Sequence, residues 1–137
     1  MKKVRTLYRV IYGDTDAMGV VYYANYLRWF EKGRNEWLRS IGVTYREIES
    51  WGVRAPVTQA YCHYLRPARY DDTLWIETDV EYLKRASIKF VYRILMEGDE
   101  SELANGYTVH AFVDPEGRIL TTPPILKERI QDLGSST

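Results

Sequence analysis

The chain has 137 residues, with 19 basic and 19 acidic side chains, so its formal net charge at neutral pH is zero. This balance gives no global positive field of the kind that draws a protein to nucleic acid or to an anionic membrane, and we expect neither as a partner. The length is that of one domain. We therefore expect a single domain over 1–137, with a disordered tail over 134–137.

One cysteine, Cys62, excludes a disulfide within the chain and suits a reducing compartment. No apolar run of signal-peptide length follows the basic first residues, and no stretch is apolar enough to span a membrane. We expect a cytoplasmic protein. Twelve tyrosines and four tryptophans in so short a chain predict half-buried amphipathic surfaces, as at subunit contacts and ligand clefts.

In chain order, the pattern begins with one strand and one long helix. Alternating aromatic and β-branched residues predict a strand over 6–12, and two glycines with two aspartates predict a loop over 13–19. Apolar residues then recur at helical spacing over 22–41, with Gly33 inside this helix and Gly42 after it. A glycine inside a helix destabilises it by about 1 kcal/mol relative to alanine, so we expect a close packing contact at Gly33.

The rest of the chain has mainly the period of strands. Thr44 and Glu47 form a capping-box pattern, which predicts a short second helix ending near Trp51. An antiparallel sheet of about five strands wrapped around one central helix, in the α+β class, is the architecture that this order favours. The further elements are strands over 53–65, 73–83, 87–96 and 103–113, a short strand at 118–121 and a final helix over 124–133.

The most informative stretch is the loop and helix entry over 12–26, which reads YGDTDAMGVVYYANY. It has two carboxylates, Asp14 and Asp16, in a tight loop before a helix. A carboxylate there can attack or deprotonate, while the free N–H groups of the helix start, near Val21 to Ala24, can stabilise an oxyanion. We expect Asp14 to cap the turn. An isolated D-x-D is most often only a turn or an N-cap, which is the alternative for Asp16.

This run, followed by LRWFE, resembles the signature of the hotdog-fold acyl-CoA thioesterases, especially the 4-hydroxybenzoyl-CoA thioesterases and the Tol-Pal-associated small acyl-CoA thioesterases. The stretches 66–72 (RPARYDD) and 82–87 (YLKRAS) are similar to the same family, so the resemblance covers about residues 4–130. It implies a hotdog fold, an acyl-CoA substrate, no separate cofactor, and self-association to dimers or tetramers. It also implies that Asp16 is the catalytic carboxylate.

The resemblance also implies the oxyanion donor and the phosphate-binding turn, whereas the other candidate residues follow from their position in or beside the loop. The backbone N–H of Tyr23 is the expected main oxyanion donor. The hydroxyl of Tyr12 could reach Asp16, which makes Tyr12 a catalytic candidate, with an amphipathic core position as the equal alternative. For the loop positions Gly19, Val20 and Asn25, the alternative is a purely structural role. For the strand turn with Lys84, Arg85 and Ser87, the alternative is an ordinary solvated hairpin. The expected substrate-binding residues are Gly19, Val20 and Asn25 in the loop, and Lys84, Arg85 and Ser87 at a strand turn that would hold the phosphates of coenzyme A.

Two positions depart from the family patterns. The Tol-Pal-associated branch usually has histidine where this chain has Tyr23, and the 4-hydroxybenzoyl-CoA branch usually has proline where it has Ala24. Without that imidazole, the rate should show no step from it near pH 6.5. Asp16 stays open as nucleophile or general base. A thioesterase acting on acyl carrier protein and a non-catalytic acyl-binding protein are the alternative functions, and no metal site is expected.

Overall fold

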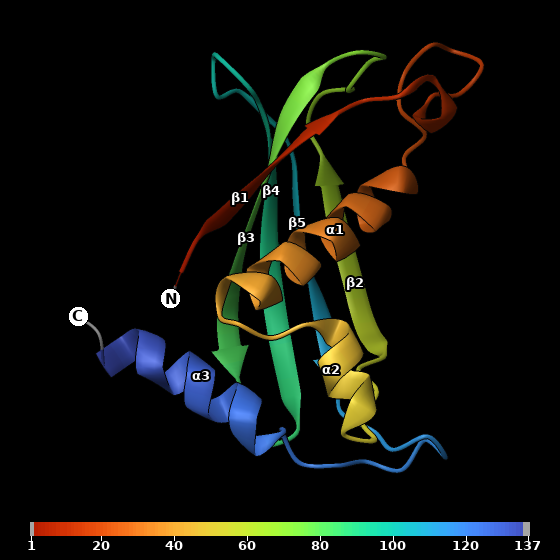
Figure 1. Ribbon diagram of the computed structural model, residues 1–137. Helices are drawn as coiled ribbons and strands as arrows, with labels where there is room; N and C mark the ends of the chain where they lie inside the picture. Colours follow the sequence, from red (N-terminus) through yellow and green to blue (C-terminus); the bar gives the residue numbers. More distant parts are fainter. Residues whose placement is uncertain (1, 136–137) are drawn as a thin grey trace.

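The computed structural model describes residues 2–135, which fold into one sheet and three α-helices (Figure 1). The five strands form one antiparallel sheet in the order β1-β3-β4-β5-β2, so β1 and β2 are its edges. This confirms the predicted α+β architecture. The elements are β1 (Val4–Arg9), the 3-10 helix η1 (Tyr12–Asp14), α1 (Asn25–Ser40), α2 (Tyr45–Ser50), β2 (Val57–Tyr64), β3 (Thr73–Leu83), β4 (Ser87–Met96), β5 (Glu102–Ala111) and α3 (Pro124–Ser135).

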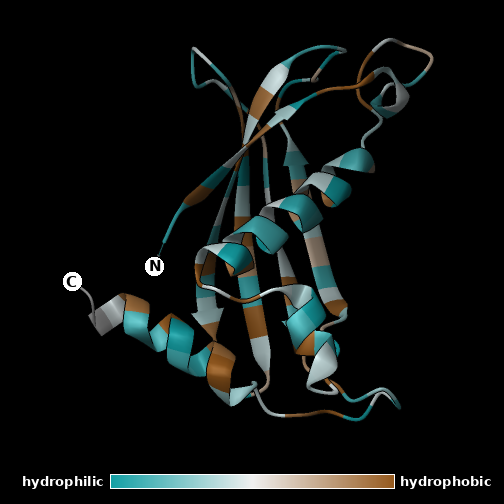
Figure 2. Ribbon diagram, in the orientation of Figure 1, coloured by the Kyte–Doolittle hydropathy of each residue, from teal (hydrophilic) through white to brown (hydrophobic). Residues whose placement is uncertain are grey.

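Helix α1 lies across one face of the sheet because one side of the helix is apolar. Hydrophilic residues occupy much of its opposite side (Figure 2). The ring of Phe30 stacks on the ring of Tyr92 in β4, with 4.2 Å between the centroids, so helix and sheet meet through aromatic packing. The buried residues of α1 recur every three or four positions and are Tyr26, Trp29, Phe30, Gly33, Trp37 and Leu38.

The glycine inside α1 lies in close contact with β3, as predicted. A Cβ atom at Gly33 would lie 2.3 Å from Oγ1 of Thr78 and 2.8 Å from Cγ2 of Ile76. No side chain fits in that space without displacing the side chains of Thr78 and Ile76. Glycine therefore allows the helix to lie directly on β3, although it lowers the intrinsic helix propensity.

The first two predicted boundaries differ from the structure. Strand β1 ends at Arg9, three residues early, because the carboxylate of Asp14 accepts the N–H of Ile11 and the chain turns into η1. Helix α1 begins at Asn25, three residues late, because the residues at positions 20 and 21 still form β-bridges. Local turn chemistry, which the apolar period does not report, sets both boundaries.

Later boundaries agree more closely, and β3 and β4 have the predicted bounds. Strand β2 begins only after Pro56, which has no N–H to donate to a ladder. The predicted short strand at 118–121 is only an isolated bridge between Val113 and Ile119. Helix α3 continues to Ser135, two residues beyond its predicted end, and residues 136–137 of the expected tail lie outside the described residues.

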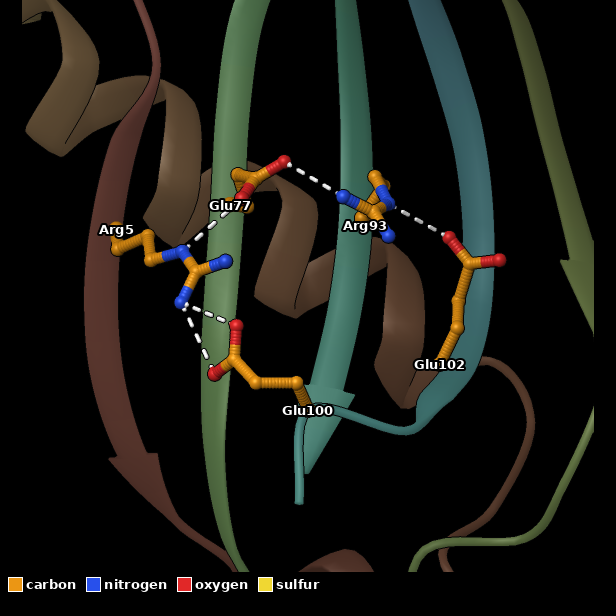
Figure 3. A network of polar contacts seen from close by, with 5 residues as sticks. All are labelled: Arg5, Glu77, Arg93, Glu100 and Glu102. Carbon is orange, nitrogen blue, oxygen red and sulfur yellow. Dashed lines mark hydrogen bonds and ion pairs between the residues drawn. The ribbon is translucent and has the colours of Figure 1, made fainter. Parts of the chain in front are cut away.

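The face of the sheet away from α1 carries a network of charged side chains (Figure 3). The carboxylate of Glu77 in β3 is buried and accepts from Nε of Arg5 at 3.0 Å and from Nη1 of Arg93 at 3.3 Å. Arg5 also pairs with Glu100, and Arg93 pairs with Glu102. Two cationic partners compensate the burial of the carboxylate.

Candidate active site

The loop between β1 and α1 is a narrow two-stranded hairpin. The N–H of Asp16 donates to the carbonyl oxygen of Val20 at 2.8 Å, and the N–H of Tyr22 donates to that of Asp14 at 2.9 Å. Gly19 closes the tip with a φ of 79°, a conformation that favours glycine. The hairpin therefore orders both aspartates. Direct substrate contacts by Gly19 and Val20 stay predictions.

Asp16 lies at the tip of this hairpin, and its side chain is exposed. Its Oδ1 atom accepts the N–H of Met18 at 2.7 Å, which is the geometry of an Asx-turn. Within residues 2–135 no other hydrogen bond to this carboxylate is formed, so its second oxygen is open to solvent. The Asx-turn therefore occupies Oδ1 of Asp16 and leaves Oδ2 available for chemistry.

Asp14 is buried and orders the loop, as predicted. Its Oδ2 atom accepts from the hydroxyl of Tyr8 at 2.6 Å and from the N–H of Ile11 at 3.0 Å. Burial and the hydrogen bond between the Tyr8 hydroxyl and Asp14 raise the pKa of Tyr8 to about 12, so the phenol keeps its proton at neutral pH. The backbone oxygen of Asp14 accepts from Nδ2 of Asn25 at 2.8 Å. Asn25, the first residue of α1, thus connects the start of the helix to the loop.

The start of α1 has fewer free N–H groups than the sequence predicted. The N–H of Val21 donates to the carbonyl oxygen of Ala68 at 2.8 Å, and that of Tyr22 is used within the hairpin. This corrects the expectation for those two residues, because the loop pairs with neighbouring backbone before it becomes helical. The N–H groups of Tyr23 and Ala24 donate to no acceptor in the described part of the chain. They lie at the positive end of the helix dipole.

Tyr12 is 79% exposed and belongs to η1, so its alternative interpretation as a core residue is wrong. Its ring meets that of Tyr70 edge-on, with 6.0 Å between centroids. In the described structure the hydroxyl forms no hydrogen bond to Asp16 or to another residue. Its catalytic role stays a prediction.

The turn between β3 and β4 holds Lys84, Arg85 and Ser87 at the end of the sheet opposite the Asp16 loop (Figure 1). The hydroxyl of Thr122 donates to the carbonyl oxygen of Lys84 at 2.6 Å, which holds the turn against the segment before α3. An open cleft of about 780 Å³ lies here, lined by Lys84, Arg85 and Lys127 and by no carboxylate among the described residues. Ser87 does not line it; its carbonyl oxygen accepts the N–H of Lys84 at 2.8 Å.

One chain does not bring these two groups of residues together. Strand β3 has 11 residues, so its ends are roughly 35 Å apart at a rise of about 3.3 Å per residue. The Asp16 loop adjoins the first end, where the N–H of Val10 donates to the carbonyl oxygen of Asp72. Lys84 and Arg85 follow the other end. The six predicted substrate-binding residues therefore form two separate clusters.

Sequence reasoning missed one residue of the helix entry. The hydroxyl of Tyr64, the last residue of β2, donates to the carbonyl oxygen of Tyr23 at 2.9 Å. The two residues are 41 positions apart, and nothing in the local pattern around Tyr64 distinguishes it from other strand tyrosines.

Residues 2–135 show neither a candidate metal site nor a candidate membrane span. No group of three or more histidine, cysteine, aspartate or glutamate side chains is arranged to hold a metal ion. No helix in this part of the chain has the length and apolar character needed to cross a membrane.

The chain is similar in sequence and fold to known thioesterases. Residues 10–130 match the family model of the Thioesterase-like superfamily. The chain is 35% identical over 107 residues to the acyl-CoA thioester hydrolase YbgC of Escherichia coli O6:H1, covering 78% of this chain and 79% of that protein. A hypothetical protein from Aquifex aeolicus has a crystal structure with a TM-score of 0.86 and 33% identity, covering 92% of this chain and 98% of that one.

The DHNA-CoA thioesterase from Staphylococcus aureus is also similar, with a TM-score of 0.92 and 25% identity over 98% of this chain and 93% of that one. Fold and relatives together define a thioester hydrolase with the hotdog fold. The chain belongs to the Thioesterase-like superfamily, which confirms the family that its loop resembled.

Proposed function

We propose that the protein hydrolyses a small or medium acyl-CoA or aroyl-CoA thioester, with Asp16 as the catalytic carboxylate. The observation that carries this proposal is the composition of one ordered loop. The loop presents a carboxylate oxygen that no group of residues 2–135 binds, followed by two adjacent N–H groups, at Tyr23 and Ala24, that have no acceptor in the same range. Thioester hydrolysis needs a nucleophile or an activated water, and donors for the charge that develops on the carbonyl oxygen.

Asp16 can act in two ways. As a nucleophile it attacks the carbonyl carbon, the thiolate of coenzyme A leaves, and water hydrolyses the resulting mixed anhydride. As a general base it takes a proton from a water that attacks the same carbon directly. In both cases the N–H of Tyr23 would stabilise the oxyanion. In a rapid-quench experiment, release of thiol ahead of free acid would support the anhydride.

The cleft beside α3 is our candidate site for the nucleotide end of coenzyme A. Lys84, Arg85 and Lys127 converge on it, and phosphate groups are favourable ligands for such a cluster of cations. Its open shape suits a solvent-exposed part of the substrate. Ser87 would contribute through the turn that it closes rather than by lining the cleft.

Self-association is part of this proposal, and β2 is its candidate contact. This edge strand is exposed along most of its length and carries Val57, Tyr61 and Tyr64, each between 42% and 47% exposed. The other edge strand carries Arg5 and Arg9, which form ion pairs. A long, uncharged, aromatic edge favours pairing with a second strand, whereas charged edges oppose it.

Antiparallel pairing of two β2 strands would also connect the two clusters of site residues. The two-fold axis of such a dimer turns the second sheet end for end, which brings the Lys84 turn of one copy to the same end as the Asp16 loop of the other. One substrate could then reach both. Dimers of this kind can pair further into the tetramers that the resemblance implies. We retain a cytoplasmic location as a prediction, supported by the single cysteine.

The decisive experiment compares thiol release by the wild type, Asp16→Asn and the control Asp71→Asn. Asp71 is an exposed carboxylate at the same end of the sheet, with a φ of 70° that asparagine tolerates. The substrates run from short to long acyl-CoA, benzoyl-CoA and 4-hydroxybenzoyl-CoA. We expect Asp16→Asn to lose about a hundredfold or more in kcat while Asp71→Asn stays near wild type.

The carrier is tested separately. If the cleft binds the nucleotide, Lys84→Ala and Arg85→Ala raise KM for acyl-CoA but not for the matching acyl-pantetheine, which lacks it. A preference for acyl carrier protein over acyl-CoA would favour the carrier-protein thioesterase. A wild type that binds acyl-CoA but hydrolyses nothing in the panel would favour the non-catalytic acyl-binding protein.

A further inference from the structure

The hydroxyl of Tyr64 connects the end of β2 to the entry of α1. It donates to the carbonyl oxygen of Tyr23 at 2.9 Å. The ring is held edge-on against two neighbours, with centroids 5.0 Å from Tyr26 and 6.3 Å from Tyr23. The side chain that makes this bond is therefore oriented by aromatic packing on more than one side.

The acceptor oxygen belongs to the same planar peptide unit as the N–H of Ala24. Because the peptide bond is trans and planar, holding the carbonyl of Tyr23 also sets the direction of that N–H, which points the opposite way. The N–H of Ala24 has no acceptor among residues 2–135. In the described part of the chain, the one other donor to the Tyr23 carbonyl is the N–H of Tyr26, at 3.3 Å, which is a long contact. Tyr64 is therefore the stronger anchor of this peptide.

The neighbouring peptide unit needs no such help. The N–H of Tyr23 shares its peptide plane with the carbonyl of Tyr22, and that oxygen accepts the N–H of Asn25 at 3.0 Å within the turn. The first unpaired N–H is thus oriented by local backbone. The second depends on a side chain from a strand 41 residues away.

The phenol is also suited to a permanent donor role. Although Tyr64 is 42% exposed, partial removal of its phenol from water, followed by the hydrogen bond with Cys62, raises its pKa above the ordinary value, so the hydroxyl stays protonated at neutral pH. A hydrogen bond accepted by a peptide carbonyl polarises the peptide and strengthens donation by its N–H.

We propose that Tyr64 is a positioning residue that aims and polarises the Ala24 N–H for the oxyanion of the thioester reaction. Its hydroxyl touches the peptide and not the substrate. This inference rests on the proposed function, since it assigns Tyr64 to the oxyanion site of the Asp16 chemistry.

Tyr64→Phe removes the hydroxyl and keeps the ring. We expect kcat to fall about five- to tenfold, the effect of losing one neutral hydrogen bond, with KM within about twofold of wild type. The matched control is Tyr107→Phe, a tyrosine of the neighbouring strand β5 whose ring stacks on Tyr61 and which belongs neither to the site clusters nor to the β2 edge. Its kcat should stay at the wild-type value.

Two analogues distinguish positioning from a structural role. A trifluoromethyl-ketone analogue of the acyl-CoA hydrates to a tetrahedral centre that mimics the intermediate, whereas the plain thioether analogue mimics only the bound ligand. Tyr64→Phe should weaken the first about as much as it lowers kcat and leave the second unchanged. Unfolding midpoint and oligomeric state are recorded for each variant.

An unchanged kcat in Tyr64→Phe would overturn the inference, and so would equal weakening of both analogues, which indicates a general distortion. Either result leaves the proposed function intact if Asp16→Asn is inactive. If the wild type itself hydrolyses no thioester, the proposed function fails first and takes this inference with it.

Discussion

Tyr8 of β1 donates its hydroxyl to the buried carboxylate of Asp14 at 2.6 Å, so the strand that leads into the candidate active-site loop also holds that loop in place. The same carboxylate oxygen accepts the N–H of Ile11. Asp14 therefore ends β1 and orders the hairpin that presents Asp16. The less exposed aspartate of the pair is structural, and the exposed one, Asp16, is the carboxylate that we propose for catalysis.

Tyr8→Phe should lower the free energy of unfolding by about 1.5–3 kcal/mol, because the lost hydrogen bond has a charged acceptor. Urea denaturation measures this. Tyr70→Phe is the control, since Tyr70 is 57% exposed and should change stability by no more than about 0.5 kcal/mol. Equal stability of Tyr8→Phe and wild type would show that the bond does not hold the loop.

Gly33→Ala should destabilise the protein by about 1–3 kcal/mol, although alanine is the better helix former. The added Cβ would lie 2.3 Å from Oγ1 of Thr78. That oxygen is buried and has no hydrogen-bond partner in the described structure, so Thr78→Ala removes the nearest clashing atom. In a double-mutant cycle the effect of Gly33→Ala should shrink in the Thr78→Ala background. Strictly additive effects would exclude this contact as the cause.

Glu77→Ala should lower the free energy of unfolding by about 1–3 kcal/mol, because two arginines lose a buried counter-charge. The effect is below that of a fully buried pair, since the side chains of Arg5 and Arg93 are 37% and 46% exposed. Glu100→Ala is the control, because Glu100 is an exposed partner of the same Arg5. The midpoint temperature of thermal unfolding should be clearly lower for Glu77→Ala than for Glu100→Ala. The reverse order would contradict the role of burial.

His110 is the titratable core residue with the clearest pH signature, because both ring nitrogens are hydrogen-bonded. Nδ1 lies 2.9 Å from the carbonyl oxygen of Ala55, which can only accept, so we assign the proton to Nδ1. Nε2 then accepts from the hydroxyl of Thr108 at 2.9 Å, and that oxygen accepts from the hydroxyl of Tyr92 at 2.5 Å. A second proton on the ring would disrupt this chain.

Burial and then the nearby charge of Arg34 lower the pKa of His110 to about 4, against about 6.5 in the unfolded chain. The folded state therefore binds a proton less readily, and stability is lost as pH falls from 6.5 towards 4, by about 2 kcal/mol between pH 7 and 4.5. Urea denaturation at both pH values should give a smaller loss for His110→Gln than for wild type. His63→Gln is the control, since His63 is exposed on β2; identical losses in wild type and His110→Gln would refute the assignment.

Several features followed from residues close together in sequence. The alternation in β3 and β4 predicted the bounds of both strands, and the capping box at Thr44 predicted α2. The glycine at position 33 predicted a close contact of the helix, although not that β3 is the element it contacts. The two aspartates were predicted to differ in role, and the structural role of Asp14 is confirmed. These features depend on backbone geometry and turn chemistry within a few residues.

Other features depend on residues that are far apart in the chain and could not be predicted from local pattern. The donor to the Tyr23 carbonyl comes from a strand 41 residues away. Glu77 lies on the polar side of the β3 alternation, yet it is buried, because Arg5 and Arg93 cover it from neighbouring strands. The separation of the loop cluster from Lys84 and Arg85 follows from the length of β3. Local periodicity predicts that a strand forms and which side is apolar. Only strand register and helix packing determine which polar groups meet. These contacts join segments that are far apart in sequence, and the local pattern of one segment does not specify which residues of the other it will contact.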